Sequence, residues 1–173
     1  MRWTKMEIIL VAVMLLSLNT ELFAEQPMAG LWVMPDASAL LEIRPENDSS
    51  NSESFEIRII SVLNSEFSSA DDVELMGQPR TDRKNADEAL KSRSLEGLKI
   101  GQGFQLEGAR LTGGTIYDPE SGKNYRAQLQ LEEDGLLRVR AYLGFSVLGQ
   151  TMHWRRANEF KETMLQMLAD IPD

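Results

Sequence analysis

The fold of this chain is decided by the stretch Gly113-Gly-Thr-Ile-Tyr-Asp-Pro-Glu-Ser-Gly-Lys-Asn-Tyr-Arg-Ala-Gln-Leu-Gln-Leu-Glu-Glu-Asp-Gly-Leu-Leu-Arg-Val-Arg-Ala-Tyr142, which predicts three strands joined by two tight turns. In the first turn, Asp118 can bond the backbone ahead of it, Pro119 presets φ, and Gly122 accepts the positive φ at which the chain turns back. The strand that leaves this turn alternates apolar with polar residues: Tyr125, Ala127, Leu129 and Leu131 against Arg126, Gln128, Gln130 and Glu132. Such alternation is typical of a half-buried antiparallel sheet.

The second turn, Glu133-Asp134-Gly135, allows two registers. A two-residue loop would place Leu131 opposite Arg138 and mix the apolar and polar faces. A three-residue loop with Gly135 in the left-handed conformation keeps apolar residues opposite each other. We therefore predict the pairs Leu131 with Leu137, Leu129 with Val139, and Ala127 with Ala141. This register leaves Arg138, Arg140 and Tyr142 on the other face.

The N-terminus has the pattern of a targeting segment. Arg2 and Lys5 precede an apolar run from Ile8 to Leu18, and Ala24 offers a small residue at a cleavage point. The run is too short to cross a bilayer, which takes about 20 residues. We predict a signal peptide at 1–24 and an exported chain, periplasmic or secreted, whose residues 25–173 form one barrel domain. A retained anchor is the alternative.

Composition excludes several classes of function. The chain has a net charge of −9, and removing residues 1–24 takes away two basic and two acidic residues, so the mature chain keeps this charge. A strongly acidic protein is a poor partner for nucleic acid or anionic lipid. The absence of cysteine excludes a disulfide scaffold, a thiol nucleophile, a lipoprotein anchor and a Cys-ligated metal. We therefore expect no cofactor, no metal, no nucleic-acid partner and no stable membrane insertion after cleavage.

Further strands flank the central stretch. We expect them at Gly30–Met34, Leu40–Pro45, Phe55–Leu63, Leu98–Leu106 with a bulge at Gly101 and Gly103, and Phe145–Arg156. The polar run Glu46–Ser54 predicts a mobile hairpin loop, and Asp87–Arg93 predicts a short helical turn capped by Asn85 or Asp87. The resulting eight or nine strands, with no long helix between them, favour an antiparallel barrel or sandwich.

The tail changes period. Phe160, Met164, Met167, Leu168 and Ile171 share one helical face, and Asn158 is a suitable N-cap. We expect a helix over 158–171 that packs on the outside of the sheet.

Three segments, Gly113–Tyr125, Leu136–Tyr142 and Leu148–Arg156, closely resemble a family of small secreted bacterial proteins known as domain of unknown function 2147. Gly30-Leu-Trp32, Asp82-Arg-Lys-Asn85, Arg93 and Gly97 also match. The resemblance covers roughly 29–157 and implies a lipocalin-like barrel without a settled activity. The chain departs from the family at Ala141, where Gly is usual, in the loop at 47–54, which replaces a segment that often carries cysteines, and in the extra C-terminal helix.

Gly30-x-Trp32 and Trp154-x-Arg156 also resemble a device of lipocalins. The resemblance implies that Trp32 lies in the first strand at the closed end of the barrel, with an Arg from the last strand over its ring. Physically, a guanidinium covers an indole and can donate to nearby carbonyls, for about 1 kcal/mol when desolvated. We assign Gly30, Trp32, Trp154 and Arg156 to a structural base.

Arg140-x-Tyr142 resembles the Arg-x-Tyr with which cytoplasmic fatty-acid carriers hold a carboxylate. We therefore predict a ligand site of Arg140, Tyr142, Tyr117 and Arg93 for a small apolar or carboxylate-bearing molecule. The prediction depends on the face of the strand: if the Leu/Val/Ala face lines the lumen, Arg140 lies on the surface and its role lapses.

Catalytic chemistry has little support in the sequence. His153 is the one histidine and faces away from Trp154, so a metal pair is absent. We expect a non-catalytic ligand-binding barrel, with a protein-interaction module that has a solid barrel as the alternative. An enzyme would require a further set of polar residues to converge in one pocket: Asp82, Asn85, Arg93, Asp118 and Arg140.

Overall fold

The computed structural model describes residues 27–46, 54–62, 65–68, 70, 73–144 and 149–159. Nine strands are present in these ranges: β1 (Gly30–Val33), β2 (Ala39–Pro45), β3 (Ser54–Val62), β4 (Lys99–Glu107), β5 (Arg110–Thr112), β6 (Thr115–Asp118), β7 (Lys123–Leu131), β8 (Leu137–Tyr142) and β9 (Gln150–Arg156). The predicted signal peptide, the loop at 47–53, the strand start at 145–148 and most of the predicted C-terminal helix lie outside the described residues. Residues 157–159 are helical.

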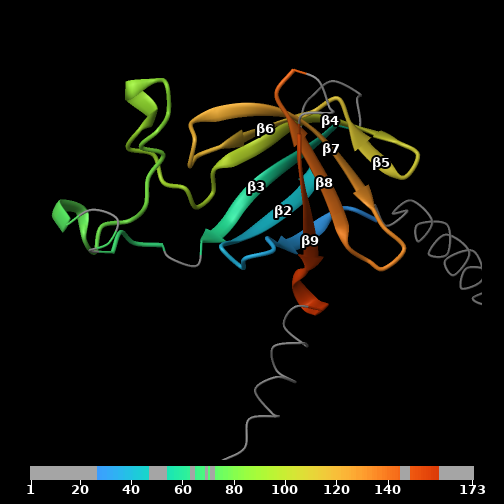
Figure 1. The fold of residues 1–173 in the computed structure, drawn as a ribbon, viewed down its shortest axis with the longest axis horizontal. Coiled ribbons are helices and arrows are strands. Elements are labelled where there is room, and N and C mark those ends of the chain that lie inside the picture. Colours follow the sequence, from blue (N-terminus) through green and yellow to red (C-terminus); the bar gives the residue numbers. More distant parts are fainter. Residues whose placement is uncertain are drawn as a thin grey trace, which may run out of the picture.

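The strands form one antiparallel sheet that closes on itself (Figure 1). The order β3-β2-β1-β9-β8-β7-β5-β4 is closed by pairing between β3 and β4. Both β5 and β6 pair with β4 on one side and with β7 on the other, so they share one position in the ring. The fold is therefore a barrel with eight strand positions, and the sandwich is excluded.

Two glycines explain why β5 and β6 are separate strands. Gly113 has φ +75°, and a Cβ at Gly114 would collide with the ring of Phe104. The chain needs the left-handed turn and the missing side chain at this point because Phe104 fills the interior. The sequence pattern did not predict β5.

The register predicted for the central hairpin is confirmed. Leu131 pairs with Leu137, Leu129 with Val139, and Ala127 with Ala141. Gly135 has φ +82° and donates its N–H to the carbonyl of Glu132. Because one face of this hairpin fills the barrel, the hydrophobic pattern decided the register.

The long connection between β3 and β4 lies beyond one end of the barrel (Figure 1). It holds two 3₁₀ turns, η1 (Val73–Leu75) and η2 (Glu88–Leu90). Asp87 caps η2 by accepting a hydrogen bond from the Ala89 N–H, as one of the two predicted caps. This connection builds the rim at that end.

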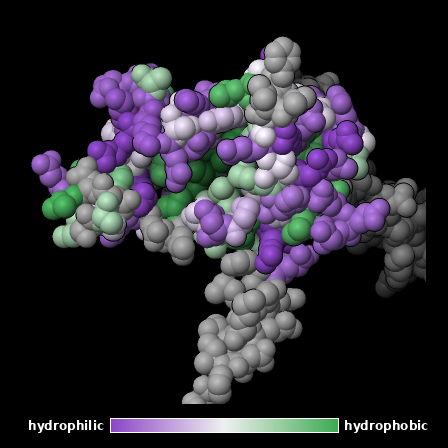
Figure 2. All heavy atoms as spheres, viewed as in Figure 1, coloured by the Kyte–Doolittle hydropathy of each residue, from purple (hydrophilic) through white to green (hydrophobic). Residues whose placement is uncertain are grey.

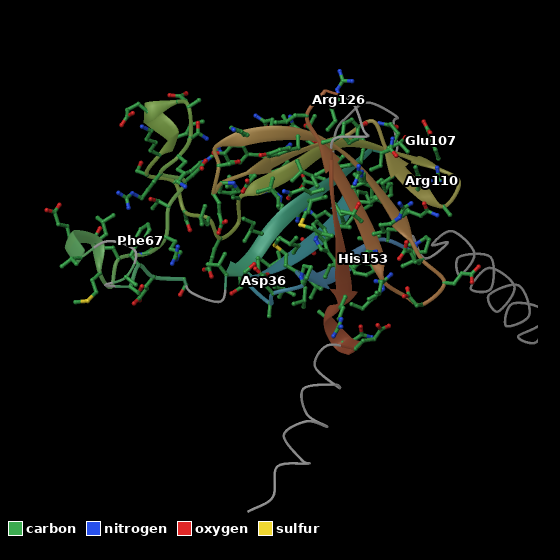
Figure 3. All side chains as sticks on the ribbon, in the orientation of Figure 1. Asp36, Phe67, Glu107, Arg110, Arg126 and His153 are labelled. Carbon is green, nitrogen blue, oxygen red and sulfur yellow. The ribbon has the colours of Figure 1, made fainter. Side chains whose placement is uncertain are left out.

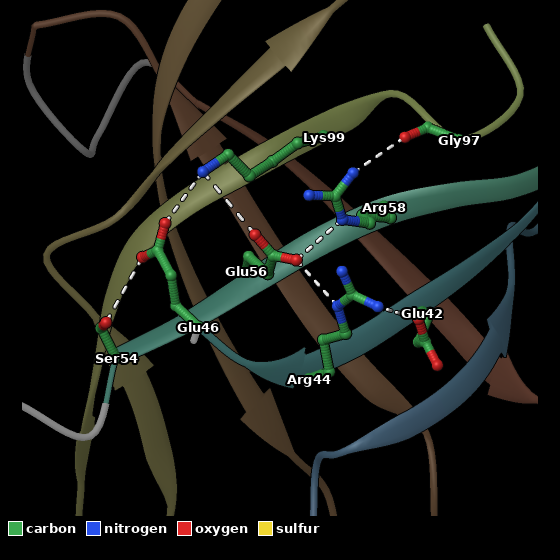
Figure 4. Close-up of polar contacts among 8 residues, drawn as sticks. All are labelled: Glu42, Arg44, Glu46, Ser54, Glu56, Arg58, Gly97 and Lys99. Atoms are coloured by element: carbon green, nitrogen blue, oxygen red, sulfur yellow. Dashed lines mark hydrogen bonds and ion pairs between the residues drawn. The ribbon is translucent and has the colours of Figure 1, made fainter. Parts of the chain in front are cut away.

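The outer face of β2, β3 and β4 carries paired charges (Figure 4). Glu56 accepts from Nε of both Arg44 and Arg58 at 2.7 Å, and Lys99 Nζ lies 2.9 Å from Glu46. Burial alone would raise the pKa of Glu56, but the hydrogen bonds from Arg58 and Arg44 outweigh it and hold that pKa below its usual value. The carboxylates and the basic side chains on this side of the barrel are therefore paired with one another.

Candidate functional site

The base of the barrel is sealed by two tryptophans and an arginine. Trp32 and Trp154 have exposed fractions of 0% and 2%. The Arg156 guanidinium lies 4.3 Å from the centroid of the Trp32 ring and donates through Nη1 to the Ala29 carbonyl at 3.0 Å. Its Nη2 donates to the Pro27 carbonyl. The predicted stacking of Arg156 on Trp32 is confirmed.

The backbone beside this stack is adapted to it. Gly30 has φ +116°, and a Cβ there would lie 3.2 Å from Arg156 Nη1. Around the two indoles the interior is filled by side chains with exposures of 2% or less: Leu41, Ile43, Phe55, Ile57, Phe104, Leu111, Leu129, Leu137 and Val139. Packing of this kind leaves little space for a ligand at the base.

The opposite end, the mouth, is less completely filled. Several of its inner apolar side chains are only partly buried: Met34, Val62, Leu95, Tyr125 and Met152. Figure 2 shows a recess on this side, lined with hydrophobic atoms and surrounded by hydrophilic ones. Partly exposed apolar side chains in a concave, polar-rimmed setting are typical of a small-molecule site.

The wall of the barrel is incomplete beside this recess. β9 pairs with β1 only through Trp32–Arg156 and Val33–Arg155, whereas it pairs with β8 along five residues. The first part of β9, including Met152, therefore has one hydrogen-bonded neighbour within the described part of the chain. This gap lies on the mouth side of the sealed base.

Three polar side chains stand at the rim. Ser121 Oγ donates to Asp118 Oδ2 at 2.6 Å, and Tyr125 Oη lies 3.4 Å from Ser121 Oγ. Tyr125 pairs with Ile116 across β6 and β7, so it faces the interior. Tyr125 was predicted to lie on the apolar face of its strand but not to be a site residue. A hydroxyl group on an otherwise apolar face is the sequence feature that could have identified it.

A second polar cluster fastens the β3–β4 connection to the rim. Asp82 is fully buried and accepts hydrogen bonds from Tyr117 Oη at 2.5 Å, Asn85 Nδ2 at 2.7 Å, and Arg93 Nη2 and Nε at 2.7 and 2.9 Å. Because Tyr117 pairs with Asn124 and alternates with Ile116, its side chain lies on the outer face of β6. The cluster is therefore a latch outside the lumen.

The electrostatics of this latch favour a structural role. Burial and the hydrogen bond to Asp82 raise the pKa of Tyr117 to about 12. Tyr117 is thus a neutral donor at ordinary pH and a poor general base. Gly122 has φ +70°, and a Cβ there would collide with the Lys84 carbonyl oxygen, so the connection packs closely on the β6–β7 turn.

The predicted ligand residues divide into two pairs. Arg93 and Tyr117 meet in the latch, with the guanidinium 5.7 Å from the ring centroid. Arg140 donates to Thr151 Oγ1 at 2.9 Å and lies with Tyr142 on the outer face of β8, because Val139 faces the interior. The Leu/Val/Ala face lines the lumen, so Arg140 lies on the surface and does not contact a ligand inside the barrel.

The residues on which an enzyme hypothesis depended are likewise divided. Asp82, Asn85 and Arg93 share the latch, while Asp118 bonds Ser121 and Arg140 lies on β8. His153 faces outward as predicted, with its Nε2 3.4 Å from Glu132. Within the described ranges, no three His, Asp or Glu side chains are grouped so as to hold a metal ion. Those ranges also contain no helix long and apolar enough to span a membrane.

Comparisons with known proteins identify a family and a solved structure with a similar fold. A family model described as "Uncharacterized protein conserved in bacteria (DUF2147)" matches residues 30–156. A solved structure described as "Protein HP1028 from the human pathogen Helicobacter pylori belongs to the lipocalin family" is similar, with a TM-score of 0.59 and 19% sequence identity. The alignment covers 78% of this chain and 87% of the other. No curated protein matches the sequence.

Proposed function

Since this chain belongs to the uncharacterised bacterial family DUF2147 and folds as a lipocalin-like barrel, we propose that it binds a small, largely apolar ligand through the open end of that barrel. One observation carries the proposal: the side chains around the two indoles at the base are almost fully buried, whereas Met34, Val62, Tyr125 and Met152 at the mouth are only partly buried, and Figure 2 shows an apolar recess there. Apolar surface left accessible in a concavity favours binding of an apolar molecule, at about 25 cal/mol per Å² removed from water.

The rim restricts the chemistry of the ligand. The polar groups there are the Tyr125 and Ser121 hydroxyls and the Asp118 carboxylate. A carboxylate head would meet the like charge of Asp118, whereas a hydroxyl or amine would find acceptors. We therefore favour a ligand with an apolar body and a neutral or cationic hydrogen-bond donor over a fatty acid.

The test is to fill the mouth with one side chain. Ala141 lies on the inner face of β8 at the mouth, and Thr151 is an exposed residue on the outer face of β9. Binding of the apolar fluorophore N-phenyl-1-naphthylamine is measured for the wild type, Ala141→Trp and the matched control Thr151→Trp. We expect Ala141→Trp to weaken binding by at least tenfold and Thr151→Trp to stay within twofold of the wild type. No binding by the wild type, or equal binding by all three, would contradict the proposal.

We also propose that the protein is exported and that residues 1–24 are removed. The basic start, the short apolar run and the small residue Ala24 support this. Expression in a bacterial host, followed by fractionation and intact mass measurement, should give a chain beginning at Glu25 outside the cytoplasm. A full-length chain in the cytoplasm would exclude it.

A further inference from the structure

The outer face of β5, β7, β8 and β9 differs in charge from the rest of the molecule. These four strands contain seven of the chain's 18 Lys and Arg residues and none of its 27 Asp and Glu residues. In a protein with a net charge of −9 this is a strong local reversal of sign. We call the outward side chains of these strands the basic face; its charged members are Arg110, Arg126, Arg138, Arg140 and Arg155, with His153 beside them.

The strand register arranges these side chains in rows across the sheet. Arg138 lies opposite Gln130 and His153, and Gln130 in turn lies opposite Arg110. In the next row Arg140 lies between Gln128 and Thr151. Neighbouring strands are about 4.8 Å apart and successive outward residues about 7 Å apart. The guanidinium groups are thus spread over a surface rather than gathered in a pocket.

Much of this face is accessible. Arg110, Arg126, His153 and Arg155 are exposed, and Figure 3 shows Arg126 pointing outward above the sheet and His153 on the front of β9. One acidic side chain, Glu132, lies at its edge, where it contacts Arg138 Nε at 3.1 Å and His153. A second, Glu107, lies opposite Arg110. Acidic side chains therefore lie at the edge of this face, at strand ends and in the β7–β8 turn, and none lies on the four strands themselves.

The charges on β2, β3 and β4 are arranged differently. There each Arg and Lys has a carboxylate partner: Glu56 accepts from Arg44 and Arg58, and Glu46 from Lys99 (Figure 4). On the basic face Arg138 and His153 share the carboxylate of Glu132, Arg140 donates to Thr151, and Arg110, Arg126 and Arg155 are exposed. Like charges on one face repel one another, so their concentration lowers the stability of the barrel unless an anionic partner covers them.

We propose that the basic face is a docking surface for a protein partner that presents acidic side chains. Its composition supports a protein over a lipid or a nucleic acid. Arginine is its commonest side chain, Tyr142 and His153 lie beside the arginines, and Lys123 is the single lysine of the four strands. Arginine and tyrosine are enriched in protein–protein interfaces, where lysine is depleted. A planar guanidinium binds a carboxylate through two parallel hydrogen bonds, and the neighbouring Gln128 and Gln130 amides can bond a peptide backbone.

The test uses a fluorescein-labelled peptide of alternating Glu and Ser, measured by anisotropy at low and at physiological salt. Arg126→Gln/Arg155→Gln removes two exposed charges from the basic face. Lys84→Gln/Lys91→Gln removes two charges from the β3–β4 connection, the exposed Lys84 and the partly buried Lys91 that pairs with Glu88, and is the control matched in net charge. We expect the wild type to bind, the first variant to lose at least tenfold in affinity, and the control to stay within twofold. Added salt should weaken wild-type binding.

Further outcomes distinguish an acidic protein partner from other occupants of the basic face. If the two variants lose affinity equally, net charge alone accounts for binding and the proposal is wrong. If phosphatidylglycerol vesicles or polyphosphate bind the wild type more tightly than the peptide does, the partner is not an acidic protein. If the purified chain self-associates and the Arg126→Gln/Arg155→Gln variant does not, the occupant is a second copy. The lumen is not touched by these substitutions, so N-phenyl-1-naphthylamine binding should be unchanged in both variants.

Discussion

The base and the mouth of the barrel are built by the same strands but enclose their side chains differently. At the base, Trp32, Trp154 and their neighbours are almost completely buried, and Arg156 closes the end. At the mouth, Met34, Val62 and Met152 are only partly buried, and the rim is held by a polar latch around Asp82. The contrast is the basis of our proposal that the base stabilises the fold and that the mouth binds a ligand.

The largest expected effect comes from removing an indole at the base. Trp32→Ala deletes a buried ring, its hydrogen bond to the Met28 carbonyl and its contact with Arg156. We expect a loss of about 3–5 kcal/mol in the free energy of unfolding, measured by urea denaturation. If the variant still folds, its preference among apolar probes should not change. A loss below about 1 kcal/mol would show that the base is not the stable end.

A matched pair of leucines compares the two ends directly. Leu129 is fully buried at the base, whereas Leu95 is partly buried beside the mouth. Leu129→Ala should cost about 3 kcal/mol and Leu95→Ala about 1 kcal/mol, because a cavity forms only where the surroundings are closed. Urea denaturation of both variants checks this. Equal losses would mean that the difference in burial has no energetic counterpart.

The latch is the next element to test. Asp82→Asn keeps the shape of the side chain but replaces one carboxylate oxygen, which accepts from Tyr117 or from Arg93. We expect a loss of about 2 kcal/mol, because a partly exposed guanidinium loses its charge partner. Hydrogen exchange should accelerate in the β3–β4 connection and remain unchanged at Leu129. Faster exchange throughout the barrel would show instead that the latch supports the whole fold.

The two ends should respond to opposite extremes of pH. The pKa of Glu56, beside Phe55 near the base, is lowered in the folded state, so its contribution to stability is present above its unfolded pKa and is lost as pH falls. The pKa of Tyr117, near the mouth, is raised to about 12, so its contribution is present below its unfolded pKa of about 10 and is lost as pH rises toward 12.

Thermal melting as a function of pH measures these smaller effects. Relative to the wild type, Glu56→Gln should flatten the loss of Tm below pH 4.5, and Tyr117→Phe should flatten the loss between about pH 10 and 12. Each variant is the control for the other, since each should leave the opposite limb unchanged. A variant that altered both limbs, or neither, would refute the assignment of that group.

Much of the base and of the central hairpin could be predicted from sequence. The alternation from Tyr125 to Leu131 has one buried face, so only one register keeps it apolar. The spacing of Trp154 and Arg156 places both on the side of the barrel where Trp32 lies. Side chains in a regular strand alternate between two faces, so the sequence pattern alone predicted which of them face the interior.

The mouth was harder to predict because its geometry is not local. Arg93 reaches Asp82 and Tyr117 only after the β3–β4 connection packs against β6, and no strand period predicts that contact. The face of Arg140 followed from the register, but its resemblance to a carrier motif suggested a lumen role that the outer position does not support. Tyr125 was overlooked because a tyrosine on an apolar face appears to be only part of the core.

Native-state hydrogen exchange with and without N-phenyl-1-naphthylamine tests the central claim most directly. The account predicts that backbone amides at the base, such as those of Leu131, Leu137 and Trp154, exchange only through global unfolding. Amides at the mouth, such as those of Val62, Tyr125 and Met152, should exchange through local opening and become protected when the probe binds. Uniform protection in the free protein, or probe-dependent protection at the base and not at the mouth, would contradict it.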